Sequence, residues 1–147
     1  AIGGENAVSG AKRFQKDVLR LEPDLITIDY GRNDMFLTEE EMRMAWESMI
    51  REAHQKNIKV LLITPAADSG AIYYEPEKQK LTDQQMAEII RELAEEYGTG
   101  LADAEAVFED LFAHGHRRSE YAASVNHPNR RGHEIVADCL AEWFPYC

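Results

Sequence analysis

The sequence has no long apolar run: its longest apolar stretch, from Val60 to Ile63, is the length of a single strand. A helix that crosses a bilayer needs about 20 apolar residues, so no transmembrane segment is expected. The first ten residues have neither a basic start nor an apolar centre, and they do not predict a signal peptide. Because the chain starts at Ala1 without methionine, we expect upstream residues to be absent. We expect a soluble protein, with the cytoplasm as the favoured compartment.

Basic residues and cysteines are also scarce. The 16 Lys and Arg residues are outnumbered by 27 Asp and Glu residues, which gives a net charge of -11. This charge argues against nucleic acid or an anionic membrane as the main partner, and it is typical of a well-solvated surface. Two cysteines cannot form a disulfide framework. Cys139 falls on a predicted apolar helix face, and Cys147 ends the chain.

Apolar residues at helical spacing alternate with short β-branched runs along the chain. Capping boxes at Thr38 and Thr82 mark two helix starts. The run from Ile58 to Ile63 is typical of a strand buried on both faces. The pattern predicts helices over residues 11–21, 38–55, 82–97, 107–112 and 135–144, strands over 25–30, 58–63 and 101–104, and a long loop over 66–81.

This alternation predicts an α/β fold, in which a parallel sheet lies between two layers of helices. No linker or repeat divides the chain, so residues 1–147 are expected to form one domain. In such sheets, ligands bind beyond the carboxyl ends of the strands. Candidate site residues are therefore sought in the loops at that edge.

Two loops at that edge carry residues suited to catalysis. Residues 31–34 follow a predicted strand, where Asn33 can aim its side-chain NH2 into the crevice; an ordinary turn would use the same residue types. Before the last helix, Pro128 fixes the chain next to His127, which places an imidazole where a general base is needed. A solvated loop histidine is the alternative for His127, and His133 is assigned a structural role at the helix start.

A third segment, residues 6–10, precedes the first predicted helix. Gly10 can present its N–H group to an anion there, although a helix start capped by Ser9 explains the same residues. Taken in order, Asn-x-Val-Ser-Gly at 6–10, Pro-Asp-Leu-Ile-Thr-Ile-x-Tyr-Gly-Arg-Asn-Asp at 23–34 and Asn-His-Pro-Asn-x-x-Gly-His at 126–133 resemble the conserved blocks of the SGNH (GDSL-like) hydrolase family.

The resemblance implies a three-layer, flavodoxin-like α/β domain that hydrolyses acyl esters without a cofactor or a metal. It implies that the Gly10 N–H group and the Asn33 side-chain amide donate to an oxyanion hole. His127 would be the general base that activates a serine, and Asp34 would brace its loop. Two oxyanion donors and a base are what ester hydrolysis through a tetrahedral intermediate requires.

The sequence departs from the family at two catalytic positions. The family's nucleophile lies in a Gly-Asp-Ser block at the end of its first strand, and no Gly-Asp-Ser occurs here. We expect that strand, and most of the second, to lie upstream of Ala1, so that the domain is N-terminally incomplete. Ser124 stands where the family usually places the acid, three residues before His127, so no acid is assigned; a backbone carbonyl or Glu120 could orient the imidazole. The serines that could substitute for the nucleophile are Ser9, Ser48, Ser69, Ser119 and Ser124.

Other classes of function stay open. A catalytically inactive SGNH-like module would bind an acylated or glycan ligand, and Ser124 in place of the acid favours it. An unrelated flavodoxin-like nucleotide binder would need a strand before Gly3-Gly4 and a lysine after it at the right spacing; no strand precedes the glycines and no lysine has that spacing. No histidine or carboxylate spacing resembles a metal-ligand set. The expected ligand is a small acyl ester or an acetylated carbohydrate, and Tyr73 and Tyr74 are expected to border its pocket; oligomeric state cannot be predicted.

Overall fold

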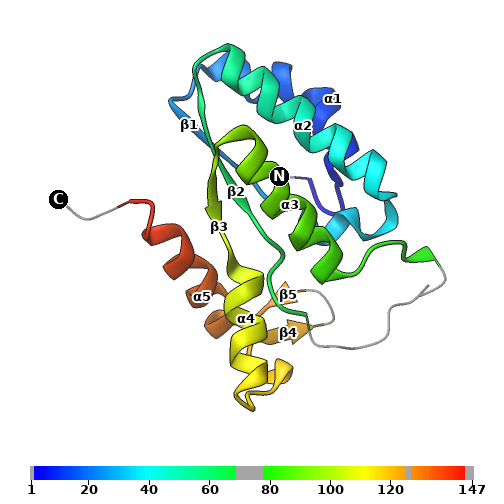
Figure 1. The fold of residues 1–147 in the computed structure, drawn as a ribbon, viewed down its shortest axis with the longest axis vertical. Helices are drawn as coiled ribbons and strands as arrows, with labels where there is room; N and C mark the ends of the chain where they lie inside the picture. The colour runs from blue at the N-terminus through cyan, green and yellow to red at the C-terminus, as the bar shows by residue number, and fades with distance from the viewer. Residues whose placement is uncertain (1, 69–77, 125–126, 145–147) are drawn as a thin grey trace.

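A three-stranded parallel sheet organises the fold (Figure 1). The computed structural model describes residues 2–68, 78–124 and 127–144. The strands lie in the order β1 (Leu25–Ile28), β2 (Lys59–Ile63) and β3 (Gly100–Ala102). Both strand pairs are parallel, so the carboxyl ends of all three strands meet at one edge of the sheet. The expected α/β class is confirmed.

Helices connect and cover these strands. The predicted capping boxes at Thr38 and Thr82 are both formed, and Gly98 ends its helix in the left-handed conformation, with φ of 61°. The remaining elements are α1 (Ala7–Asp17), η1 (Leu19–Leu21), η2 (Gly31–Phe36), α2 (Glu39–Gln55), α3 (Asp83–Tyr97), α4 (Ala104–Ala113), η4 (Arg118–Glu120), β4 (Ala122–Ser124), β5 (His127–Pro128) and α5 (Arg130–Ala141).

The central strand β2 is buried on both faces, as its sequence predicts. Val60 and Leu62 join the main core under α1, α2 and α3. Leu61 and Ile63 point the other way and pack against α5. This alternation follows from the two-residue period of a strand, so β2 places helices on both faces of the sheet.

Strand β1 is buried differently from β2. Ile26 and Ile28 are buried in the main core, but Thr27, on the opposite face, is exposed within the described part of the chain. Within the described part of the chain, β1 is therefore buried on one face only. Two features cause this: α5 covers β2 and β3 rather than β1, and among the described strands none pairs with the outer edge of β1.

The last helix begins and ends earlier in the chain than its apolar pattern predicts. It ends at Ala141, and Trp143 lies beyond it with half of its surface exposed. The Trp143 indole N–H donates to the Leu101 carbonyl oxygen at 3.0 Å, which ties the chain end to β3. Four residues named above lie outside the described residues: Ser69, Tyr73, Tyr74 and Cys147.

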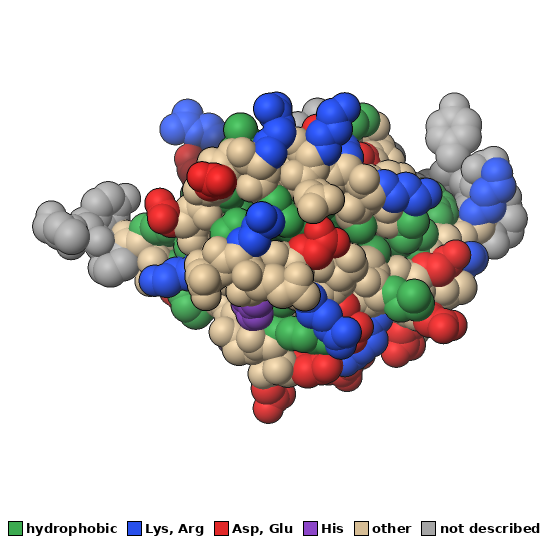
Figure 2. Space-filling view, turned by 90° about the horizontal axis from the view of Figure 1, so that it is seen from above, with side chains coloured by type: hydrophobic (Ala, Val, Ile, Leu, Met, Phe, Trp, Pro, Cys, Tyr) green, Lys and Arg blue, Asp and Glu red, His purple; other side chains and the backbone are tan. Residues whose placement is uncertain are grey.

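The surface mixes charges of both signs. Figure 2 shows basic and acidic side chains interspersed, with apolar side chains between them. Among the helices described by the structure, none combines the length and the apolar character needed to cross a bilayer.

Candidate active site

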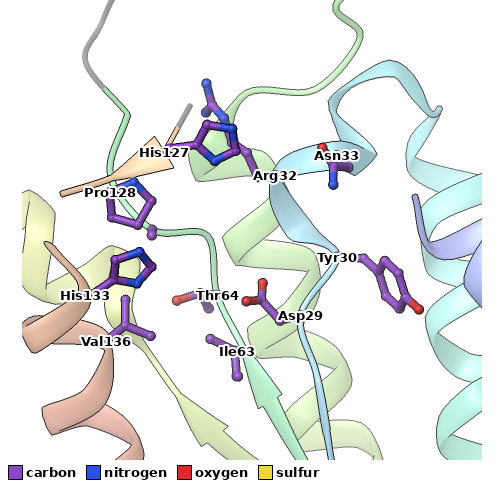
Figure 3. Close-up of a pocket in the computed structure, with 11 residues that line it drawn as sticks. Asp29, Tyr30, Arg32, Asn33, Ile63, Thr64, His127, Pro128, His133 and Val136 are labelled. Atoms are coloured by element: carbon purple, nitrogen blue, oxygen red, sulfur yellow. The ribbon is translucent and has the colours of Figure 1, made fainter. Parts of the chain in front are cut away.

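A pocket of about 230 Å³ opens at the carboxyl edge of the sheet. Its walls come from the ends of β1 and β2, from η2, from β5 and from the first turns of α5, which brings the predicted Asn33 and His127 together (Figure 3). Apolar walls are supplied by Ile63 and Val136. The polar lining consists of Asp29, Arg32, Asn33, Thr64, His127 and His133.

The His127 loop is held by the residue two positions later. The Asn129 backbone N–H donates to the Tyr121 carbonyl oxygen at 2.8 Å, and its side-chain NH2 donates to the Glu120 carbonyl oxygen at 2.9 Å. The Asn129 side-chain oxygen also caps α5 by accepting the Gly132 N–H at 3.1 Å. One side chain therefore locks the β4–β5 hairpin, which carries the imidazole, onto the start of α5.

Gly132 permits this close approach. A Cβ atom at this position would lie 2.4 Å from the Tyr121 carbonyl oxygen and 2.7 Å from Pro128 Cβ. Any larger residue would push α5 away from the hairpin, and would move His127 relative to the sheet.

Asn33 lies in η2, directly after β1. Its backbone N–H donates to the Tyr30 carbonyl oxygen at 2.9 Å, which fixes the turn. Within the part of the chain that the structure describes, its half-buried side-chain amide makes no hydrogen bond. The NH2 group is therefore available to a ligand in the pocket.

Asp34 holds the Asn33 turn in place by hydrogen bonds to two neighbouring helices. Its fully buried carboxylate accepts the Ala7 backbone N–H and the Trp46 indole N–H, each at 2.7 Å. These bonds join η2 to the first turn of α1 and to α2. Burial raises the pKa of Asp34 to about 6, although both hydrogen bonds favour the charged form. The geometry agrees with the bracing role that the family resemblance implies.

Gly10 lies away from the pocket. It is inside α1, where its N–H donates to the Asn6 carbonyl oxygen at 3.0 Å, and it is not among the lining residues. A Cβ atom at Gly10 would lie 2.4 Å from the Tyr30 ring, so the ring requires a glycine here. To bind an oxyanion, the Gly10 N–H would have to leave its helical partner, and its predicted role stays a prediction.

Arg32 forms the rim of the pocket together with two carboxylates. Its guanidinium donates to both oxygens of Asp83 and, at 2.7 Å, to Asp68. Arg118 contacts Asp68 from the other side at 3.4 Å. This network joins η2, the loop after β2, the start of α3 and η4. Burial raises the pKa of Asp83, although the Arg32 charge opposes that shift.

Besides Arg32, three polar residues in the pocket were not predicted as site residues. Asp29 follows β1, Thr64 follows β2, and His133 projects from the first turns of α5. The Thr64 hydroxyl is already engaged, since it donates to Asp103 at 3.0 Å and accepts the Glu105 N–H at 2.9 Å. The sequence could have indicated these residues only by their position, because each lies at the carboxyl end of a strand or in the segment that faces it.

The structure places the other candidates outside the pocket. Of the four candidate serines in the described residues, Ser9, Ser48, Ser119 and Ser124, none lines it. Ser124 lies directly opposite His127 in the β4–β5 pair. The Glu120 carboxylate contacts Arg117 and His116. In the described ranges, no group of three or more His, Cys, Asp or Glu residues is arranged to hold a metal ion.

A parallel sheet with an asparagine and a histidine at its carboxyl edge is the arrangement that SGNH-type hydrolases are expected to have. The chain belongs to the GDSL-like Lipase/Acylhydrolase family, whose sequence profile matches residues 1–135.

Individual relatives support the same fold. A curated acetylxylan esterase from Geobacillus stearothermophilus is 24% identical over 152 residues, which cover 92% of this chain and 66% of that protein. The crystal structure of an acetyl xylan esterase, AlAXEase, has a TM-score of 0.80 and 24% identity, with 98% and 78% of the two chains covered. A catalytic serine-to-alanine mutant of an acetylxylan esterase from Geobacillus stearothermophilus has a TM-score of 0.82 and 21% identity, covering 98% and 69%. The chain thus spans 66% of the length of the curated relative.

Proposed function

We propose that this protein hydrolyses acyl esters, with His127 as the general base and the Asn33 amide as an oxyanion donor. The observation that carries the proposal is that these two residues, from distant parts of the chain, line one pocket at the carboxyl edge of the sheet. The nucleophile in the proposal is a serine from a segment upstream of Ala1.

The proposed reaction proceeds in two balanced steps. The serine oxygen attacks the ester carbonyl carbon while His127 takes the hydroxyl proton, and the carbonyl oxygen becomes an oxyanion facing Asn33. The carbon–oxygen bond to the alcohol then breaks, and the alcohol leaves with the proton from His127. Water attacks the acyl-serine by the same route, which releases the carboxylic acid and restores the serine.

The free edge of β1 supports an upstream origin for the serine. Among the described strands, only β2 pairs with β1, so the edge of β1 that faces away from β2 has no partner strand there. A parallel strand added at that edge would end beside Asp29 and the pocket. Its last residue would then face the same cavity as His127.

A short acyl group on a carbohydrate is the substrate class that we propose. The pocket of about 230 Å³ is small, and its lining mixes polar with apolar side chains, which suits an acetyl group better than a long acyl chain. All three relatives described above are called acetylxylan esterases. The net charge of -11 does not suit nucleic acid as a partner.

Intact mass spectrometry of the purified protein, before and after fluorophosphonate treatment, tests this function. We expect a mass larger than that of the 147-residue chain, with one adduct on a serine upstream of Ala1. An adduct on a serine within residues 1–147 would overturn the proposed source of the nucleophile. Absence of any adduct on a folded protein would overturn the serine esterase and favour a binding module, which Ser124 in the acid position also favours.

Replacing Asn33 with alanine should lower kcat for an acetyl ester by about 10²- to 10³-fold while KM changes little. The amide acts on the oxyanion, which exists only in the transition state and intermediate, so its loss affects turnover more than substrate binding. Initial rates over a range of substrate concentrations measure both constants.

Asn33→Asp is the matched variant, because it keeps the side-chain size and removes the NH2 donor. It should lose at least as much activity as Asn33→Ala, and thermal unfolding of both variants should show that they fold. If either variant kept kcat within about threefold of the parent value, Asn33 would not be an oxyanion donor.

A further inference from the structure

The pocket contains a carboxylate that the proposed mechanism does not yet use. We infer that Asp29 is the acidic partner that stabilises the protonated form of His127. The family usually places this acid three residues before the histidine, where this chain has Ser124. The inference rests on the proposed function, since it concerns the same general base. In this chain the acid would then lie at the end of β1 instead of in the loop that carries the histidine.

The geometry places Asp29 in the same cavity as His127. Figure 3 shows the Asp29 carboxylate and the His127 ring directed into the pocket from β1 and from β5. Asp29 is the only carboxylate that lines this pocket among the residues the structure describes. It is exposed to the cavity, and the described residues offer it no hydrogen bond or ion pair.

The nearby charges leave Asp29 uncompensated. Arg32, on η2, is the cation that lines the pocket, and its guanidinium is bound to Asp83 and Asp68. Burial raises the pKa of Asp29, and no cation lowers it. Asp34, on the far side of η2, repels Asp29, because the Asp29 charge is one of the causes that raise the pKa of Asp34.

The other polar side chains that line the cavity carry no permanent charge. His133 faces it from α5 and Thr64 from the end of β2, whereas the Tyr30 ring points away from it, toward Gly10 in α1 (Figure 3). A proton that arrives on His127 during acyl transfer therefore creates the positive charge that this cavity lacks. An anionic Asp29 lowers the free energy of that imidazolium, which is what the acid of a catalytic triad does.

Nuclear magnetic resonance titration of the histidine side chains tests the inference without requiring activity. Replacing Asp29 with asparagine removes a negative charge and should lower the pKa of His127 by about half a unit or more. Asp24→Asn is the matched control, since Asp24 lies at the opposite end of the same strand. It should leave His127 unchanged.

The outcomes separate the possible partners. A downward shift of His127 in Asp29→Asn, but not in Asp24→Asn, supports the inference. A shift confined to His133 would assign Asp29 to that residue and overturn the inference. No shift at either histidine would also overturn it.

The pH profile of turnover adds a second readout. His127 must be neutral to accept the serine proton, so a lower pKa moves the acidic limb of kcat/KM to lower pH. The plateau should fall about tenfold or more in Asp29→Asn, because the imidazolium loses its stabilising charge. A merely structural role for Asp29 would lower the plateau without moving the limb.

Fluorophosphonate labelling distinguishes the two possible failures. If the parent protein is labelled on serine and Asp29→Asn leaves the acidic limb in place, the inference fails and the esterase stands. If the parent is not labelled at all, the proposed function fails, and the histidine titration still decides whether Asp29 and His127 are coupled. Asp29→Asn should unfold at the same temperature as the parent or above it at pH 7, since it removes a desolvated charge.

Discussion

The variant His127→Gln is expected to hydrolyse a short acyl ester at least about 10³-fold more slowly than the parent protein. Glutamine keeps much of the size and polarity of the side chain but cannot accept the serine proton, so the nucleophile stays a neutral hydroxyl. Because His127 lines the pocket and its hairpin is fixed by Asn129, the loss should appear in kcat with the fold preserved. Initial rates with p-nitrophenyl acetate measure it.

His114→Gln is the control for this variant. His114 is exposed, its ring contacts the Asp110 carbonyl oxygen at 2.8 Å, and it does not line the pocket. It should keep the parent rate. An active His127→Gln would show that another group is the base, and His133, in the same pocket, would be the first to replace.

The fold could be predicted because local patterns determine it. The two capping boxes and the two-sided apolar run of β2 each depend on residues close together in the chain. The burial of β1 could not be predicted, since it depends on which helices and strands cover Thr27. That information lies outside the strand's own sequence.

The residues of the candidate site also differ in whether local sequence could predict them. His127 and Asn33 were predictable because each is next to a residue or turn that restricts the backbone, and because their motifs match a family. Asp29 and His133 were missed as site residues because only the tertiary arrangement brings them to one pocket.

Gly10 illustrates the limit of interpreting a glycine from the sequence alone. The sequence predicted an N–H donor, whereas the structure shows a glycine that makes room for the Tyr30 ring. Both reasons require the absence of a side chain, so the residue type alone could not distinguish them. The contact with Tyr30, 20 residues along the chain, accounts for the glycine, and the N–H donor role stays a prediction.

Replacing Asp34 with asparagine is expected to lower the free energy of unfolding by about 2 to 3 kcal/mol at neutral pH. The two carboxylate oxygens each accept a buried N–H group, from Ala7 and from Trp46. Asparagine has one oxygen and one NH2, so one of these donors would face another donor and lose its partner. Urea unfolding of both proteins measures the difference. Asp110→Asn is the matched control; it alters a side chain that is 71% exposed and should change stability by less than about 0.5 kcal/mol.

The pH dependence of this effect identifies its cause. In the folded protein the pKa of Asp34 is about 6, above the value of about 3.9 for an unfolded chain. Below pH 4 the Asp34 carboxyl is protonated in both the folded and the unfolded state, so no free energy is lost by burying a charge. Between pH 4 and pH 6 the unfolded chain loses this proton first, so its ionisation lowers the stability of the parent protein as pH rises. Asparagine cannot ionise, so the destabilisation by Asp34→Asn should be larger at pH 4.5 than at pH 7.5. An equal difference at both pH values would show that Asp34 titrates normally, and that its hydrogen bonds offset the cost of burying its charge.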